Sequence, residues 1–327
     1  MRLSDTSGQD LGRRLAARDL SAAAAALNLV ENRSPAAAEQ TAALLEAVSV
    51  ATLGHEAPAQ IVGVTGPPGV GKSSLLSRLL ACWRASGRSV AVLAVDPSSR
   101  RSGGSLLGDR ARIERDPDDA EVFIRSTAAG DRLGGLAPAT RAAAAALSAA
   151  FDVVVIETVG VGQSETEVAD VADVVVVVVQ PGSGDVLQFL KSGIMEIPDV
   201  LVVTKSDLGA VAHRALADLR AALRSLGADS VPVVAVSSVS PPDGIDELVD
   251  ALDQRHRALD LPGHRLRGRR AAALAQFTSE HGERGLRALG GRRAASAWLQ
   301  TQPPGLEPTA LVAGLESRAQ DSPGRDR

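Results

Sequence analysis

One stretch of the chain has the residue types and spacing to hold the phosphates of a nucleotide. It reads Gly66-Pro67-Pro68-Gly69-Val70-Gly71-Lys72-Ser73, followed by Ser74. The glycines let successive backbone N–H groups turn toward an anion, and the next helix adds partial positive charge at its N-terminus. A lysine placed like Lys72 bridges the β- and γ-phosphates, and the Ser73 hydroxyl is a ligand for Mg²⁺. An apolar run precedes the stretch and helix-forming residues follow it, which is the context that this motif requires.

Two carboxylates at the ends of apolar runs could serve the same metal ion. Asp96 ends one such run and Glu157 ends another. Gly160 lies three residues after Glu157, so the carboxylate could hold Mg²⁺ through water while the Gly160 N–H donates to a γ-phosphate. The alternative is that Asp96 caps a loop and Glu157 is a solvated strand end. A phosphate loop nearby favours the metal role for Glu157, whereas spacing alone leaves Asp109 open.

The segment Thr204-Lys205-Ser206-Asp207 follows a later apolar run and has the residues to read a guanine base. A carboxylate placed like Asp207 accepts from guanine N1–H and the 2-amino group. Adenine lacks this pair of donors and would leave a buried carboxylate unpaired. The stem of Lys205 would pack over the base. A backbone N–H in the later segment Ser237-Ser238-Val239 would meet the guanine carbonyl, so the sequence favours GTP over ATP.

Alternating short β-branched runs and longer helical stretches must position these residues. We expect strands at 60–65, 89–95, 122–126, 152–157, 174–180, 200–204 and 231–237, and helices at 72–86, 136–150, 185–196 and 210–226. Strands that are apolar on both faces and separated by helices form a parallel sheet covered on both sides. The fold class predicted is α/β, a P-loop nucleotide-binding domain.

The segments on either side of this domain have a helical character. We expect residues 1–58 to form an N-terminal helical extension of two or three helices, residues 59–260 the nucleotide domain, and residues 261–327 a C-terminal helical arm. The basic run at 264–270 is interpreted as a solvated linker, with contact to an acidic partner as the alternative. The tail from Gln320 is expected to be disordered.

The composition excludes several classes of protein and site. The 35 Lys and Arg against 39 Asp and Glu, with 2% aromatic residues, disfavour a nucleic-acid partner that depends on phosphate neutralisation or base stacking. A single cysteine, Cys82, excludes an internal disulfide, and the five histidines lack metal-ligand spacing. The apolar runs are too short to cross a bilayer, and the N-terminus lacks a secretory signal. We expect a cytoplasmic chain with no membrane partner.

Several long motifs together resemble the MeaB/MMAA/ArgK-type GTPases, chaperones of adenosylcobalamin-dependent acyl-CoA mutases in the SIMIBI class of P-loop proteins. The resemblance covers roughly residues 20–260 and rests on GVTGPPGVGKSSL, AVDPSS, GGSLLGDRARI, ETVGVGQSE, GIMEIPDVLVVTKSD and GIDEL. It implies GTP and Mg²⁺ as ligands, slow hydrolysis that the mutase stimulates, gated transfer of cobalamin that this chain alone does not bind tightly, and a homodimer formed through the C-terminal arm.

The resemblance also assigns roles to individual residues. It places Asp109 with Ser73, Asp96 and Glu157 around Mg²⁺, puts Gln163 in a switch, and gives the base to Lys205 and Asp207. On this basis we expect the catalytic residues to be Lys72, Asp96, Glu157 and Gln163.

The chain departs from the usual family sequence at three places. Arg100 and Arg101 replace residues of the first switch, Phe189 and Ser192 alter a segment that couples nucleotide state to the mutase, and Thr204 replaces an asparagine. The last change should remove a side-chain tie between the base loop and the phosphate loop. A P-loop kinase of the amino-acid-transport type and a metal-insertion GTPase are the alternative functions. The metal-insertion reading is disfavoured because the chain lacks a His-rich tract.

Overall fold

The computed structural model describes residues 7–96, 113–128, 138–158, 168–182 and 198–321. By their internal contacts the residues form two compact units. One, the nucleotide unit, is Pro58–Leu259, and the other, the helical unit, combines Met1–Ala57 with Asp260–Arg327.

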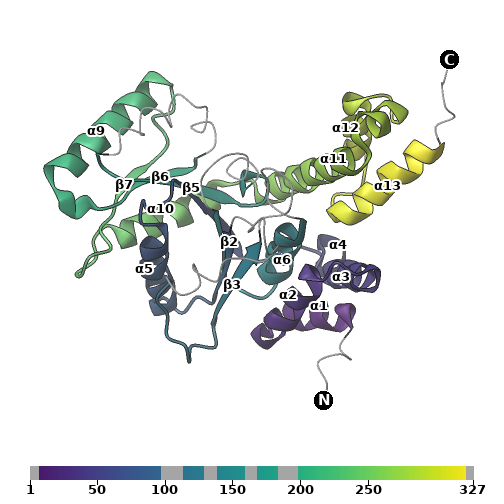
Figure 1. Ribbon diagram of the computed structural model, residues 1–327, viewed down its shortest axis with the longest axis horizontal. Helices are drawn as coiled ribbons and strands as arrows, with labels where there is room; N and C mark the ends of the chain where they lie inside the picture. Colours follow the sequence, from purple (N-terminus) through teal and green to yellow (C-terminus); the bar gives the residue numbers. More distant parts are fainter. Residues whose placement is uncertain (1–6, 97–112, 129–137, 159–167, 183–197, 322–327) are drawn as a thin grey trace, which may run out of the picture. The chain divides into compact units, whose positions relative to one another are not determined.

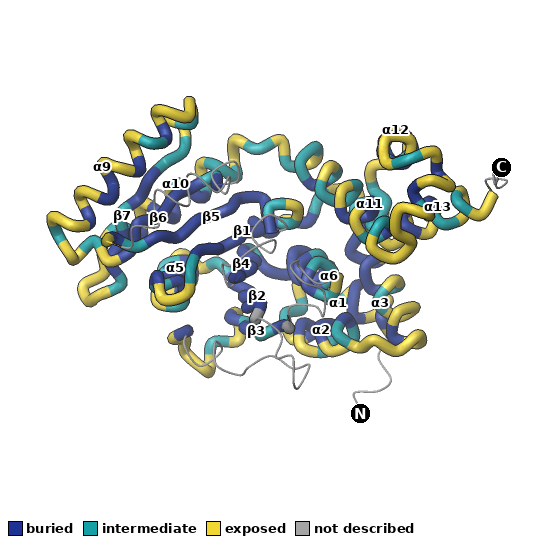
Figure 2. The backbone as a smooth tube through the Cα atoms, turned by 45° about the horizontal axis from the view of Figure 1, so that its top comes forward, coloured by how far each residue is buried: buried dark blue, intermediate teal, exposed yellow. Residues whose placement is uncertain are grey.

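The nucleotide unit contains a seven-stranded sheet in the order β3-β2-β4-β1-β5-β6-β7 (Figures 1 and 2). Every neighbouring pair in it is parallel, which confirms the predicted α/β class. The strands are β1 Gln60–Thr65, β2 Val90–Asp96, β3 Val122–Ala128, β4 Val153–Thr158, β5 Val174–Val179, β6 Val200–Val203 and β7 Val233–Ala235. All seven predicted strands are present, and β7 is the one most shortened relative to its prediction.

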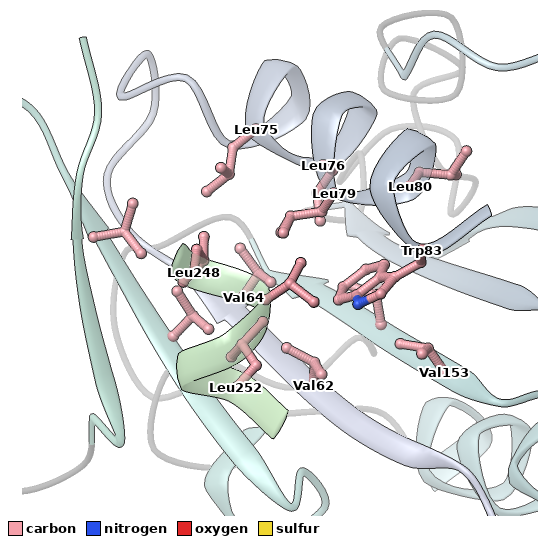
Figure 3. Close-up of a cluster of buried hydrophobic side chains, with 14 of the residues drawn as sticks. Val62, Val64, Leu75, Leu76, Leu79, Leu80, Trp83, Val153, Leu248 and Leu252 are labelled. Carbon is pink, nitrogen blue, oxygen red and sulfur yellow. The ribbon is translucent and has the colours of Figure 1, made fainter. Parts of the chain in front are cut away.

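Helices bury both faces of this sheet. They are α5 Lys72–Ala85, α6 Pro138–Ser148, α9 Ala210–Ser225 and α10 Ile245–Ala258. Helices α5 and α10 meet over one face, where Trp83 packs with valines and leucines (Figure 3). Helix α9 covers alternate residues of β5 and β6 on the opposite face. The six valines of β5 are therefore buried throughout, as Figure 2 shows for the central strands.

The predicted helices agree with this arrangement where the structure describes them. The starts of α5 and α9 coincide with those expected at Lys72 and Ala210. The helix α10, which follows β7, was not predicted. The helix expected at 185–196 lies outside the described residues.

The helical unit is made of the N-terminal and C-terminal segments of the chain. Its N-terminal helices are α1 Gly8–Ala16, η1 Leu20–Ala22, α2 Ala23–Glu31, α3 Pro35–Ala47 and α4 Val50–Leu53, and its C-terminal helices are α11 Leu261–Ala288, α12 Arg292–Gln300 and α13 Pro308–Asp321. Phe277, Leu299 and Leu315 form part of an apolar cluster among the last three helices, against which Trp298 packs. The tail was expected to be disordered from Gln320, but α13 continues to Asp321, so Gln320 is helical.

The basic run at 264–270 is not a solvated linker, which corrects the interpretation of the sequence. It lies in the first turns of α11, whose start is capped by the Asp260 side chain. Arg265 is 9% exposed and donates to the Ala57 carbonyl at 2.7 Å. Arg269 donates to both carboxylate oxygens of Glu56, at 3.1 and 2.8 Å. Arg265, Arg269, Glu56 and the Ala57 carbonyl are called the arginine clasp below, since they tie α11 to the N-terminal segment.

Candidate nucleotide-binding site

The predicted site residues follow the carboxyl ends of adjacent strands. Because the sheet is parallel, these ends lie along one edge, where open α/β sheets bind their ligands. Asp96 ends β2, Glu157 is the penultimate residue of β4, and the phosphate loop follows β1. The base loop, residues 204–207, follows β6, and Ser237 follows β7. The strand order thus separates a phosphate side from a base side along the same edge.

The phosphate loop between β1 and α5 depends on two glycines. Gly66 has φ +148°, and a Cβ there would lie 2.2 Å from the Val178 carbonyl oxygen of the neighbouring β5. Gly71, at φ +98°, caps the N-terminus of α5 in the left-handed conformation that L residues avoid. The loop therefore passes close to β5 and then turns directly into α5, whose first N–H groups face the loop.

Lys72 is the first residue of α5, and its side chain returns over the loop. The residue is only 7% exposed, and Nζ donates to the carbonyl oxygens of Gly66 at 2.6 Å and Pro67 at 3.1 Å. A buried ammonium group requires hydrogen-bond acceptors or a counter-charge. The loop holds this cation beside the helix N-terminus, and the two together favour a phosphate group.

Asp96, Glu157 and Ser73 carry carboxylate and hydroxyl oxygens, the kind of ligand that Mg²⁺ prefers. Glu157 is 5% exposed and lies in register with Ala94 of β2 and Val64 of β1. The structure therefore puts a buried carboxylate between the strand that ends at Asp96 and the strand that leads into the phosphate loop. This donor set fits a hydrated Mg²⁺ held beside nucleotide phosphates. Asp109, Gly160 and Gln163 lie outside the described residues, as do Arg100, Arg101, Phe189 and Ser192.

Thr204 connects the base loop to the phosphate loop, which corrects the expectation that replacing asparagine removes such a tie. Its hydroxyl lies 2.6 Å from the Val70 carbonyl oxygen and 3.1 Å from that of Val179. Thr204 is 3% exposed, so the contact is protected from water. The shorter side chain suffices because β6 and the phosphate loop approach each other closely at this point.

Lys205 provides a second connection to the phosphate loop. Its Nζ donates to Gln180 Oε1 and, at 3.4 Å, to the Gly69 carbonyl. Its backbone has φ +56°, one of two positive values among the described residues other than glycine. Gln180 was missed in the sequence, although its place immediately after β5 follows the same rule of strand ends as the other site residues.

Asp207 is exposed and is held by one neighbour. Ser237 Oγ donates to Asp207 Oδ1 at 2.9 Å and accepts from Val239 N at 3.2 Å. Asp207 is therefore not the buried carboxylate expected from the sequence, because the base loop extends beyond the sheet edge and leaves it open to solvent. The Val239 N–H is engaged within the loop and is not free for a guanine carbonyl.

Two groups of side chains outside this edge also have chemically reactive or metal-ligating atoms. Glu280, His281 and Glu316 of the helical unit lie close enough to share an ion, although the sequence gave no metal-ligand spacing; they are at least partly exposed, and the His281–Glu316 pair is 2.9 Å apart. Cys82 is half-buried, with Sγ 3.3 Å from Asp246 Oδ1. None of the described helices is long and apolar enough to cross a membrane.

Comparisons with known proteins agree with this geometry. The family model described as "Methylmalonyl Co-A mutase-associated GTPase MeaB" matches residues 23–286. A Caulobacter vibrioides protein with a provisional GTPase name is 45% identical over 254 residues, 76% of each chain. The mitochondrial methylmalonic aciduria type A homolog of Caenorhabditis elegans is 40% identical over 62% of this chain and 53% of its own length. A crystal structure described as an LAO/AO transport system kinase has a TM-score of 0.65 at 27% identity, covering 98% of this chain and 100% of that one.

Proposed function

Because the chain belongs to the methylmalonyl-CoA mutase-associated GTPase family, we propose that this GTPase is the chaperone of an adenosylcobalamin-dependent acyl-CoA mutase. In this role it gates delivery of the cofactor and protects or reactivates the mutase. The family match over residues 23–286 is the observation that carries the proposal. The name of the nematode relative, which refers to methylmalonic aciduria, supports the same client chemistry.

The reaction converts GTP and water to GDP and phosphate, and the described residues contribute mainly position and charge. In our proposal, residues 66–74 surround the phosphates and Lys72 neutralises charge that develops on the oxygens of the transferred group. Ser73, Asp96, Asp109 and Glu157 hold Mg²⁺, which supplies further charge neutralisation when bound. Gly160 donates to the γ-phosphate and Gln163 orients the attacking water. Thr204, Lys205, Asp207, Ser237 and Ser238 bind the base.

We infer that hydrolysis by the isolated chain is slow. Among the described residues around the phosphate loop, Glu157 carries the buried carboxylate. Because its proposed role is to hold the metal, no separate general base remains among these described residues. A partner that rearranges the switch would then raise the rate. We further propose that the protein is a cytoplasmic homodimer joined through the C-terminal arm. In this proposal the protein binds neither nucleic acid nor membrane, and it does not bind cobalamin tightly on its own.

The name of the similar crystal structure favours a second candidate, a kinase that phosphorylates a small molecule or protein. A kinase needs an acceptor pocket and a base beside the γ-phosphate. Incubation with γ-labelled GTP or ATP and candidate acceptors separates the two functions. A stable labelled acceptor would support the kinase, and release of free phosphate alone supports the GTPase.

The chaperone proposal is tested by GTP turnover of the purified chain alone and with each of several acyl-CoA mutases, with and without bound cobalamin. The Lys72→Ala variant is the matched control, because a contaminating hydrolase would not respond to it. We expect one mutase to raise the rate in the wild-type chain only. If no mutase changes the rate or the release of cobalamin, the chaperone role is wrong while the GTPase assignment stands.

A further inference from the structure

An arginine of the phosphate-loop helix reaches the loop that holds the base-reading carboxylate. Arg78 lies in the second turn of α5 (Lys72–Ala85), on the helix that begins at the phosphate loop. Its Nε donates to the carbonyl oxygen of Ser238 at 3.0 Å, although 160 residues separate the two in sequence. This contact joins the phosphate side of the site to the loop after β7.

The contact continues as a chain of hydrogen bonds to Asp207. The carbonyl of Ser238 and the N–H of Val239 belong to one planar peptide unit, so fixing the oxygen also fixes the N–H. That N–H donates to Ser237 Oγ at 3.2 Å, and Ser237 Oγ donates to Asp207 Oδ1 at 2.9 Å. Hydrogen bonds in such a series polarise one another, so each strengthens the next.

We propose that Arg78 is a positioning residue for recognition of the guanine base. Through the peptide between Ser238 and Val239 and the Ser237 hydroxyl, it holds the Asp207 carboxylate in the orientation that accepts from N1–H and the 2-amino group. The proposal rests on the base-reading role proposed for Asp207. These hydrogen bonds restrict the rotamers of the exposed Asp207 side chain before the base arrives. The entropy cost of ordering this side chain is then not part of the free energy of binding.

A purely structural role for Arg78 is the competing explanation, and α5 itself offers a matched control. Arg84 lies six residues further along the same helix, and its Nε donates to Asp119 Oδ2 at 2.8 Å. Its side chain is 20% exposed, and its partners Asp119 and Glu121 precede β3, away from the base loop. Loss of Arg84 therefore removes a comparable polar link from the helix without touching Asp207.

The test compares kcat/KM for GTP and inosine triphosphate, which lacks the 2-amino group, in wild type, Arg78→Met, Arg78→Lys and Arg84→Met. We expect Arg78→Met to raise the KM for GTP and lower the preference for GTP about tenfold, the effect of losing one hydrogen bond to a charged group, with kcat little changed. Arg78→Lys should recover part of the preference, because its ammonium can still donate to the carbonyl. Arg84→Met should keep the wild-type preference.

Each outcome decides a separate claim. A preference in Arg78→Met equal to wild type, or an equal loss in Arg84→Met, overturns the role of Arg78. A wild-type chain without preference for GTP over ATP and inosine triphosphate overturns the base-reading role of Asp207 itself. If Arg78→Met does not fold, Ser237→Ala breaks the same chain one step later. Where both variants fold, the double variant should lose little more than either single one.

Discussion

The two units of the chain both bury charged side chains, but they use them differently. In the nucleotide unit, Lys72 and Glu157 are buried at the carboxyl edge of the sheet, where a phosphate and a metal ion would meet them. In the helical unit, Arg269 and Glu56 form an ion pair with both carboxylate oxygens engaged. The first arrangement prepares a ligand site, whereas the second satisfies its charges within the protein.

The difference has a physical basis in where each charge stands relative to the backbone. The nucleotide-unit charges follow strand ends, where parallel strands present unpaired backbone groups and a helix N-terminus to a ligand. The charges of the arginine clasp join two segments more than 200 residues apart in sequence through ion pairs and hydrogen bonds. Substitutions should therefore impair activity in one unit and stability in the other.

The largest effect is expected from Lys72→Ala. Removing the cation that neutralises charge on the transferred group should lower kcat for GTP by at least about 100-fold, as loss of a preorganised electrostatic donor does elsewhere. Thermal unfolding should change little, because no packed apolar group is lost. Phosphate release and a calorimetric scan on the same sample measure both. A variant with near-normal turnover would show that the phosphate loop is not the catalytic site.

Breaking the clasp should act on stability instead. Arg269→Met removes both hydrogen bonds to Glu56 and leaves Arg265, 3.9 Å from the Glu56 carboxylate, as its remaining cation; the side chains of Arg269 and Glu56 are 13% and 11% exposed. The free energy of unfolding should fall by about 2 kcal/mol, between the loss of an exposed pair and that of a buried pair left without a partner.

The control for the clasp is Arg14→Met in the same unit, because Arg14 pairs with Asp19 at 37% and 40% exposure. That change should lower the free energy of unfolding much less than Arg269→Met does, because water screens an exposed pair. If Arg269→Met and Arg14→Met destabilise the chain equally, burial is not what makes the Arg269–Glu56 pair important for stability.

A smaller, pH-dependent effect is expected from Glu307, which precedes α13. Burial raises the pKa of Glu307 from 4.5 to about 7; Arg269 opposes the shift, and Glu56 and Glu46 add to it. Between these two values the folded chain holds a proton that the unfolded chain has released, so the free energy of unfolding falls as pH rises from about 4.5 to 7. Glu307→Gln should flatten this dependence in denaturant titrations. An unchanged slope in the variant would show that Glu307 is ionised throughout.

The smallest effect concerns the reactivity of Cys82. Burial and the neighbouring Asp246 raise the pKa of the Cys82 thiol to about 11. Because the thiolate is the reactive form, alkylation by iodoacetamide at pH 8 should be far slower for the folded chain than for the urea-unfolded chain. Equal rates would indicate that the helix pair α5–α10 opens readily around this residue.

Sequence reasoning succeeded where the determinants are local. The β-branched runs and the glycine spacing after Ile61–Thr65 identified the strands and the phosphate loop, because burial on both faces and backbone conformation are written in adjacent residues. It failed where contacts join distant segments. The run at 264–270 looked like a charged surface, and nothing near it indicated Glu56 as its partner. Gln180 follows a strand end, as the other site residues do, but its contact with Lys205 and that of Arg78 with Ser238 join segments that no spacing rule connects.

The central claim, that the edge of the nucleotide unit binds a guanine nucleotide through Asp207, is tested most directly by exchanging the hydrogen-bond pattern of that side chain. Turnover of GTP, ATP and xanthosine triphosphate should be measured for wild type and Asp207→Asn. An asparagine amide can donate to the 2-oxo group of xanthine but cannot accept two N–H groups from guanine. We predict that wild type prefers GTP and that Asp207→Asn prefers xanthosine triphosphate. A wild type that hydrolyses ATP equally well, or a variant that still prefers GTP, would contradict the account.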